Sequence, residues 1–551
     1  MKNNKIMIAL TLLVLMVVLS ASVVFAFDST DAEEEGYWYS RYNLGNLVMR
    51  SGMGHVVMPD QEQVMKAIAM VDSDFDPAEM KKGNSAYGDG DHAIPPKNPA
   101  LLSTVYKSGD PHFITKFDVN DFATQRWDPE KMDKTLTGSA NGYTILKEVE
   151  WARQFHVDEH FGTPDSDFGA YWRFVGMMMN MNAKMQTKSF LENKQSYDMS
   201  NGGDAVMLMA LSDLSNLLSV DKLAHSGVAN RYKDPVMAEI VSKGADSIFE
   251  QVSQGNPTSI REKSLAIQSL VWYAEKTANE ENKIKALNKI SSLASSLESN
   301  NPTTASQRAY YLRGLIDAKR TLGINDGSIR TVGAEFLDDF DMSTGTFKSQ
   351  NSFTIDEVGE IIGTLNALRI FETADVDADL AEEVFKTFHE EVINKGGLQI
   401  SAPPIKVAKS PFEYEGEPET YFRYDESQPF PPMAGGEFGI APVFATSTTY
   451  KDGKWTVTDS RFDTAGAMHT SNEMIWLHYD EINGFPEVDM SGSLASGEKT
   501  STKSVPKVDV GSSSTSGEKV PVTTGYSLTL LIVLLIIGLV AGIVVGKLIK
   551  K

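Results

Sequence analysis

The segment Ser259–Thr277, SIREKSLAIQSLVWYAEKT, has the pattern that decides the fold. Its apolar residues recur with the spacing of an α-helix, and the turn signal Gly255-Asn256-Pro257 comes before it. The same pattern continues through residues 141–400, which predicts a helical domain there. The other helices expected in this domain are Tyr143–His160, Phe168–Gln186, Asp204–Leu218, Pro235–Val252, Ile284–Leu297, Thr304–Leu322, Ile355–Thr373 and Ala378–Asn394.

The expected helices have similar lengths and short connections, which favours packing as antiparallel helical hairpins. Two arrangements of such hairpins are open, a closed α/α toroid and an open helical array. The sequence contains no repeat of fixed period, which weighs against an array of the solenoid kind. We therefore expect a mainly α protein.

The regions on either side of the helical domain differ from it in composition. Residues 27–140 are rich in aromatic residues, glycine and proline, which predicts an irregular region packed on the helical body. Residues 401–489 are expected to be mixed. In this region Val443–Tyr450 and Lys454–Thr458 flank Asp452-Gly453, a strong signal for a small β-hairpin.

The N-terminus has the pattern of a secretory signal peptide. Two lysines precede the apolar run Ile6–Leu19, and Val24 and Ala26 occupy the small-residue positions before a cleavage site. Residues 1–26 are therefore expected to be removed on export. An uncleaved signal anchor, which would give the chain a second membrane span, is the alternative.

The C-terminus predicts a membrane anchor. The run Ser527–Gly546 is uncharged and about 20 residues long, enough for a single transmembrane helix at residues 526–546. The lysines that follow it predict a cytoplasmic tail at residues 547–551, so that the large N-terminal part lies outside the cell. Residues 490–525, rich in serine and threonine, are expected to form a flexible stalk.

Three glycines within the predicted span, Gly538, Gly542 and Gly546, are spaced four residues apart. Small residues at this spacing let two membrane helices approach closely, which predicts a homodimer through this face. Glycine is also common in membrane helices for other reasons, so a monomer is the alternative.

Composition limits the classes of cofactor and partner. The chain has 551 residues, a net charge of −23 and no cysteine. Strong acidity disfavours nucleic acid as a partner, because phosphate binding needs clustered lysine and arginine. The absence of cysteine excludes haem c, cysteine-ligated iron–sulfur clusters and thiolate zinc. The layout of signal peptide, acidic head, stalk and lysine-tailed span resembles that of archaeal surface proteins.

The first candidate site is the sequence His156-Val-Asp-Glu159-His160. Two histidines four residues apart share one helix face and can bind one metal ion. The spacing resembles the inverzincin motif HxxEH. That resemblance implies that His156 and His160 are zinc ligands and Glu159 is the catalytic base, with a further glutamate such as Glu239 completing the site. A hydrogen-bonded core histidine is the alternative reading of His156.

The second candidate site lies on a final helix expected at Gly466–Asp480. His469 and Glu473 are four residues apart on one face of this helix. Imidazole and carboxylate together suit zinc, iron or manganese. Neither helix supplies a complete ligand set, so a full metal site would require His156 and His160 to meet His469 and Glu473 in the fold.

These features together predict a cell-surface-anchored extracellular binding protein at the cell membrane. Its ligand is expected to be a divalent metal, a surface polymer or another envelope protein. Two alternatives stay open: a metal-dependent hydrolase that uses Glu159, and a structural envelope component without an active site.

Overall fold

The structure is a computed structural model. The chain divides into two units, Met1–Lys503 and Ser504–Lys551, and every residue that the structure describes belongs to the first. The described residues are 29–57, 101–116, 122–154, 167–223, 229–323, 327–370, 376–400 and 437–478.

The described part of the chain is mainly helical with small β-hairpins, as the sequence predicts. It contains 12 α-helices: α2 (Ser29–Gly45), α4 (Gly138–Gln154), α5 (Asp167–Glu192), α6 (Gly203–Ser219), α7 (Pro235–Gln254), α8 (Ile260–Lys276), α9 (Glu280–Glu298), α10 (Ala305–Leu322), α11 (Gly327–Asp338), α12 (Ile355–Ile370), α13 (Ala378–Phe388) and α14 (Thr464–His478). Two π-helices, Asn46–Arg50 and His389–Lys395, continue α2 and α13.

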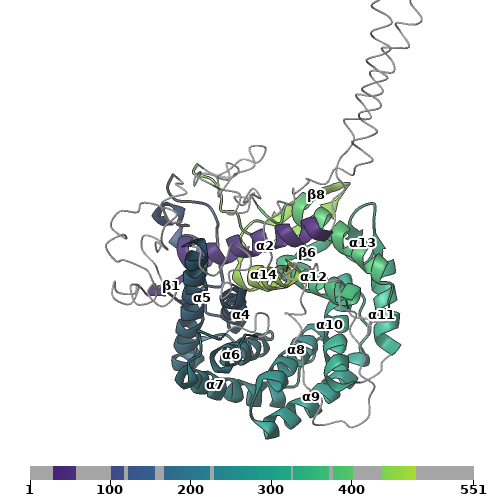
Figure 1. Cartoon of the computed structure of the whole chain (residues 1–551). Coiled ribbons are helices and arrows are strands. Elements are labelled where there is room, and N and C mark those ends of the chain that lie inside the picture. Colours follow the sequence, from purple (N-terminus) through teal and green to yellow (C-terminus); the bar gives the residue numbers. More distant parts are fainter. Residues whose placement is uncertain are drawn as a thin grey trace, which may run out of the picture. The chain divides into compact units, whose positions relative to one another are not determined.

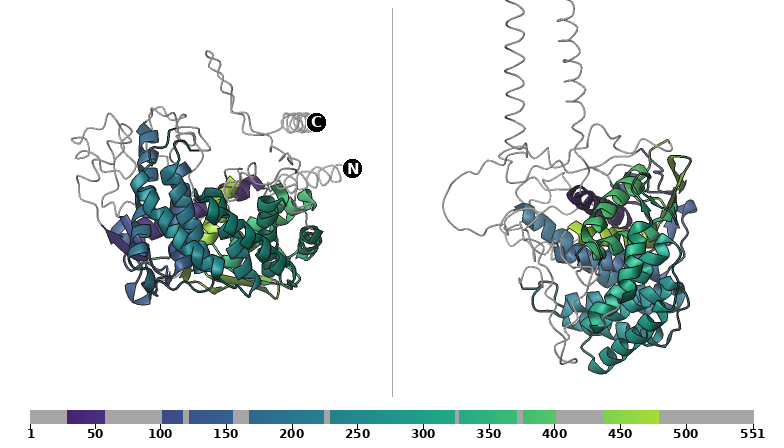
Figure 2. Two further views of the ribbon diagram at one scale, coloured as in Figure 1. Left: turned by 90° about the horizontal axis from the view of Figure 1, so that it is seen from below. Right: turned by 90° about the vertical axis from the view of Figure 1, so that its right-hand side faces the viewer.

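The helices form two concentric layers, and the inner layer closes into a ring (Figure 1). The inner helices are α4, α6, α8, α10, α12 and α14; each packs on the next, and α14 packs on α4. The outer helices that pack on them are, in the same order, α5, α7, α9, α11, α13 and α2, and α9 lies against both α8 and α10. Figure 2 shows the two layers from two further directions. Of the two arrangements expected from sequence, the helices adopt the closed toroid.

The sixth pair of inner and outer helices, α14 and α2, combines two segments that are far apart in the sequence. Its outer helix α2 lies in the segment expected to be irregular, so that expectation is wrong for Ser29–Gly45. The backbone of α2 passes close to α14, because a Cβ atom on Gly36 would lie 3.2 Å from the Cβ atom of Met474. The partner of α2 is thus far away in sequence, and no local pattern reveals it.

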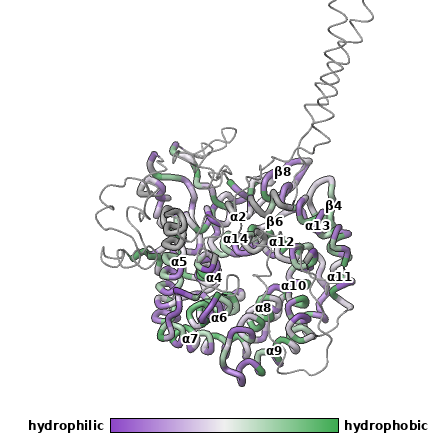
Figure 3. Tube along the Cα trace, in the orientation of Figure 1, coloured by the Kyte–Doolittle hydropathy of each residue, from purple (hydrophilic) through white to green (hydrophobic). Residues whose placement is uncertain are grey.

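Inner and outer helices differ in burial, as their layers require. The inner helix α8 is buried on all sides from Lys263 to Ala274. The outer helix α9 buries mainly one stripe, which includes Ala286, Ile290 and Leu297. Figure 3 shows hydrophobic stretches on both layers of helices. The core therefore lies between the layers and between neighbouring inner helices.

The strands form four small antiparallel sheets at the margins of the ring. The strands are β1 (Gly54–Val57), β2 (Leu101–Val105), β3 (Ser108–Gly109), β4 (Phe340–Asp341), β5 (Thr346–Phe347), β6 (Ser352–Thr354), β7 (Ser447–Lys451), β8 (Lys454–Asp459) and β9 (Phe462–Asp463). The pairs are β1–β2, β3–β9 and β4–β5, and the order of the largest sheet is β6–β7–β8. The hairpin predicted at Asp452-Gly453 joins β7 to β8, and both turn residues have positive φ, 54° and 76°.

Local signals explain several helix ends. Ser259 and Glu262 form a complete capping box at the start of α8. Asp377 caps α13 by accepting a hydrogen bond from the amide of Leu380. Helix α11 was not predicted from the sequence. It is short and begins at Gly327, a residue that weakens the helical pattern.

The membrane prediction concerns residues outside the described part of the chain. Within that part, no helix combines the length and apolar character needed to cross a membrane. The expected signal peptide, stalk, transmembrane helix with Gly538, Gly542 and Gly546, and cytoplasmic tail all lie outside it. They stay predictions from sequence.

Candidate functional site

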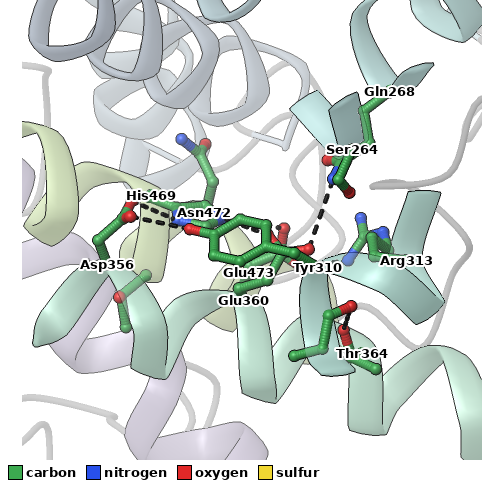
Figure 4. Close-up of polar contacts among 12 residues, drawn as sticks. Ser264, Gln268, Tyr310, Arg313, Asp356, Glu360, Thr364, His469, Asn472 and Glu473 are labelled. Carbon is green, nitrogen blue, oxygen red and sulfur yellow. Dashed lines mark hydrogen bonds and ion pairs between the residues drawn. The ribbon is translucent and has the colours of Figure 1, made fainter. Parts of the chain in front are cut away.

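Charged and polar side chains from four inner helices contact one another (Figure 4). We call this group the axial network. It consists of Arg261 on α8, Tyr310 and Arg313 on α10, Asp356 and Glu360 on α12, and His469 and Glu473 on α14.

Glycines bring α12 and α14 close enough for the network to form. A Cβ atom on Gly359 would lie 2.9 Å from the Cα atom of Thr470, and one on Gly466 would lie 2.9 Å from the amide nitrogen of Asp356. One turn further along α12, a Cβ atom on Gly363 would lie 2.3 Å from Oε2 of Glu473. The backbones of the two helices therefore touch, and side chains between these glycines face one another at short range.

His469 lies between two carboxyl groups of α12. Its Nδ1 atom is 3.0 Å from Oδ1 of Asp356, and its Nε2 atom is 3.5 Å from Oε2 of Glu360. The imidazole stacks on the ring of Tyr143 with 4.7 Å between the centroids. The side chain is buried, with 3% of its surface exposed. Both ring nitrogens thus face carboxylates inside the protein.

The network reaches solvent at the end of the ring where the inner helices begin. Nη2 of Arg261 is 3.1 Å from Oδ2 of Asp356, and these side chains are 31% and 22% exposed. The hydroxyl of Tyr310 donates a hydrogen bond of 2.8 Å to the same oxygen. Nη1 of Arg261 donates to the carbonyl oxygen of Asn201. We call the partly exposed pair Arg261–Asp356 the axial mouth.

Beneath the mouth the network is buried. Nη1 of Arg313 donates to Oε2 of Glu473 at 3.2 Å, and Nε of Arg313 is 3.7 Å from Oδ2 of Asp317. Nε2 of Gln268 donates to Oε1 of Glu360 at 3.4 Å. Replacing such buried ion pairs by apolar side chains is often neutral or stabilising, so stability alone does not account for them.

The surroundings move the pKa values of Asp356 and Glu360 in opposite directions. Burial would raise the pKa of Asp356, but Arg261 and His469 outweigh it and hold the value below its usual range. Burial raises the pKa of Glu360 to about 7, although His469 and Arg313 oppose the shift. Burial would lower the pKa of His469, but its hydrogen bond to Asp356 raises the value overall. Carboxyl groups with separated pKa values are typical of acid–base sites.

The geometry restricts the chemistry of the network. A serine hydrolase needs a histidine nitrogen turned towards a nucleophile, whereas both nitrogens of His469 face carboxylates. A glycosidase needs two carboxyl groups that flank one bond, whereas the imidazole fills the space between Asp356 and Glu360. In this arrangement the network can bind a ligand at its mouth and exchange protons with it.

The predicted metal ligands are only partly within the described residues. His469 and Glu473 share one face of α14, with 3.8 Å between Nε2 and Oε1, as their spacing predicts. Glu473 also pairs with Arg313. Among the residues that the structure describes, no group of three or more histidine, cysteine, aspartate or glutamate side chains is arranged to hold a metal ion. Because His156 and His160 fall outside these residues, the combined site stays a prediction.

The catalytic role predicted for Glu159 also falls outside the described residues. Glu239, named as a further ligand, lies on the outer helix α7 and pairs with Lys243 at 2.6 Å. Its side chain is 69% exposed, and it takes no part in the axial network.

Sequence reasoning identified His469 and Glu473 but missed their partners. Asp356 and Glu360 are four residues apart, and Glu360 directly follows Gly359 in the motif Gly359-x-x-x-Gly363. Two glycines at this spacing within an apolar helix are a signal for a close helix contact. Charged residues beside such glycines are the signal that could have revealed the network.

A scan with models of protein families finds no match to this chain, and searches of curated proteins and of solved structures find none either.

Proposed function

We propose that the protein is a cell-surface-anchored extracellular protein that binds a hydroxyl-rich surface polymer at the axial mouth. The observation that carries the proposal is the exposure of Arg261 and Asp356 above a network that is otherwise buried. The anchoring and the extracellular location rest on the N-terminal and C-terminal sequence patterns.

The chemistry of the mouth suits neighbouring hydroxyl groups. The carboxylate of Asp356 accepts hydrogen bonds, and the guanidinium of Arg261 donates several in a fixed plane. A sugar unit with two adjacent hydroxyl groups can donate a hydrogen bond to the carboxylate of Asp356 and accept one from the guanidinium of Arg261. Because the two charges already balance each other, the mouth favours a neutral ligand over an ion.

Loss of the mouth is expected to weaken polymer binding. In Asp356→Asn and Arg261→Met variants, retention on immobilised neutral polysaccharides should fall at least about tenfold, because each change removes a charge-assisted hydrogen bond of roughly 1.5–3 kcal/mol. Glu239→Gln, a change on the exposed face of α7, is the matched control and should bind normally. Equal retention of all four proteins, or of none, on a panel of neutral polysaccharides would contradict the proposal.

The metal-dependent hydrolase stays a separate proposal. If it is right, elemental analysis of the purified protein should find zinc, iron or manganese in stoichiometric amount, and a His156→Ala/His160→Ala variant should lose it. Loss of metal in a His469→Ala variant as well would place all three histidines in one site. A protein that stays metal-free after incubation with each ion would contradict both the hydrolase and the metal-binding readings. The structural envelope component would then remain as the alternative to polymer binding.

A further inference from the structure

Strand β8 forms one edge of the three-stranded sheet β6–β7–β8. It has six residues, Lys454–Asp459, and lies at the outer margin of the ring (Figure 1). Among the described residues, no strand or isolated bridge pairs with its outer side. An unpaired strand edge presents a row of backbone donors and acceptors and is a template for a further strand. The outer edge of β8 is therefore a candidate surface for strand addition.

The register of the β7–β8 hairpin fixes which backbone groups face outward. Lys451 and Lys454 pair across a two-residue turn. Such a pair exchanges both backbone hydrogen bonds, and the bonding then alternates along the strand. The backbone groups of Lys454 and Thr456 therefore bond to β7, and those of Trp455 and Val457 point to the outer edge.

The side chains of β8 alternate between two faces of the sheet. Trp455 and Val457 are partly buried, whereas Lys454, Thr456 and Thr458 are exposed. The indole N–H of Trp455 has no hydrogen-bond partner among the described residues. Tryptophan, valine and threonine are all favoured in sheets. The edge thus combines outward backbone groups with side chains that suit pairing with another strand.

We propose that β8 pairs edge to edge with β8 of a second copy of this chain, antiparallel and about a two-fold axis at Thr456. Directly opposite residues in an antiparallel pair must lie on the same face of the sheet. This register places Thr456 opposite its own equivalent, and Trp455 of each copy opposite Val457 of the other. It also places Lys454 opposite Thr458. Every pair joins residues of one face, and the outward backbone groups of Trp455 and Val457 bond to each other.

Neighbouring registers of the same pair are less favourable. A shift by one residue would place exposed side chains opposite buried ones. A shift by two residues, centred on Val457, would place Trp455 opposite Asp459, whose carboxylate already pairs with Arg461 at 2.6 Å. The register centred on Thr456 instead pairs an aromatic with a β-branched residue and threonine with threonine, combinations that stabilise sheets.

The predicted membrane anchor favours a second copy over another partner. Two paired six-residue strands cover less surface than the roughly 1,200 Å² of a stable interface, so β8 alone would join free molecules only weakly. The chain continues after α14 into the predicted stalk at residues 490–525 and the predicted transmembrane helix at residues 526–546. Copies tethered to one membrane meet at a raised effective concentration, which strengthens a weak contact.

Disulfide formation tests the register, because the chain has no cysteine of its own. Full-length Thr456→Cys in membranes, oxidised with copper phenanthroline, should form a covalent dimer, because the two opposite Cα atoms would lie about 4.5 Å apart, within reach of a disulfide. Thr458→Cys is equally exposed on the same strand, but its two copies would lie four positions apart. It should link at least about tenfold more slowly.

Two further cysteine measurements complete this test. Asn288→Cys, on the exposed face of α9, gives the rate of chance collisions. Lys454→Cys mixed with Thr458→Cys should link rapidly, because these residues would lie opposite each other. Equal rates for Thr456→Cys, Thr458→Cys and Asn288→Cys would overturn the proposal. A Thr456→Cys chain that stays monomeric would also overturn it, and protection of its thiol from a maleimide would show that another segment or protein occupies the edge.

A proline variant tests the backbone contact. In the Thr456→Cys chain, Val457→Pro removes an outward N–H group, which an edge strand tolerates, and should slow dimer formation at least about tenfold. Val457→Ala keeps this N–H group and is the matched control. Equal rates for the proline and alanine variants would overturn pairing through the edge. Circular dichroism of each variant shows whether the fold is kept.

Strand β8 takes no part in the axial network, so dimer formation and polymer binding are measured separately. Asp356→Asn in the Thr456→Cys chain should leave the rate of cross-linking unchanged. Failure to find a polymer would therefore count against the proposed function alone, and failure to cross-link would count against the dimer alone.

Discussion

Replacing Arg313 by methionine is expected to lower the free energy of unfolding by about 3–5 kcal/mol, the largest effect of any single change considered. Arg313 is 2% exposed and lies within ion-pair distance of Glu473 and Asp317, which are equally hidden from solvent. Methionine fills a similar volume but carries no charge. Among the described residues, Asp317 would keep only the longer contact of 3.9 Å to Arg320, and Glu473 only that of 3.8 Å to His469. Both buried carboxyl groups would therefore be poorly compensated.

Urea unfolding followed by tryptophan fluorescence measures this effect. Lys243→Met is the matched control, because Lys243 forms an exposed pair with Glu239 and its loss should change stability by less than about 1 kcal/mol. A second variant, Arg313→Met/Glu473→Leu, removes both members of the buried pair and should recover part of the loss. If Arg313→Met is no more destabilising than Lys243→Met, the ion pairs at the axis do not hold the inner helices together.

Gly359→Ala is expected to lower the free energy of unfolding by about 1–3 kcal/mol, although alanine is the better helix former by about 1 kcal/mol. The new methyl group would lie 2.9 Å from the Cα atom and 3.0 Å from the backbone nitrogen of Thr470. Backbone atoms cannot rotate away, so α12 and α14 would have to move apart. Asp356 and Glu360 would then separate from His469.

Gly327→Ala provides the comparison for this change. Gly327 begins α11, and a Cβ atom there would meet no atom within 4 Å, so only helix propensity should act. We expect this variant to be neutral or stabilised by up to about 1 kcal/mol. Equal melting temperatures for Gly359→Ala and Gly327→Ala would contradict the close contact between α12 and α14.

The helices that were predicted best have their signals within a few residues. Helix α10 begins after Thr304, whose side chain accepts a hydrogen bond from the amide of Gln307, and ends at Gly323, whose φ is 62°. The start of helix α8 is marked in a similar way by its capping box. Such caps act locally, so the sequence shows them without knowledge of the rest of the fold.

The axial network could be predicted only in part. His469 and Glu473 were identified because they are four residues apart on one helix. Asp356 is 113 residues from His469, and Arg313 is 160 residues from Glu473. Pairing at these separations depends on the order in which the helices are arranged around the ring. Helical periodicity in the sequence does not predict that order.

The sequence by itself determined that the chain forms many helices of similar length, where most of them begin and end, and that one hairpin turns at Asp452-Gly453. These features follow from hydrogen bonds and apolar spacing among near neighbours. Only the tertiary structure decided that α14 packs on α4 to close the inner ring, with α2 outside it, and that four inner helices bring their charged groups together. Those contacts arise because glycines let helices distant in sequence touch. The burial that results shifts the pKa values of side chains that would have their usual values in water.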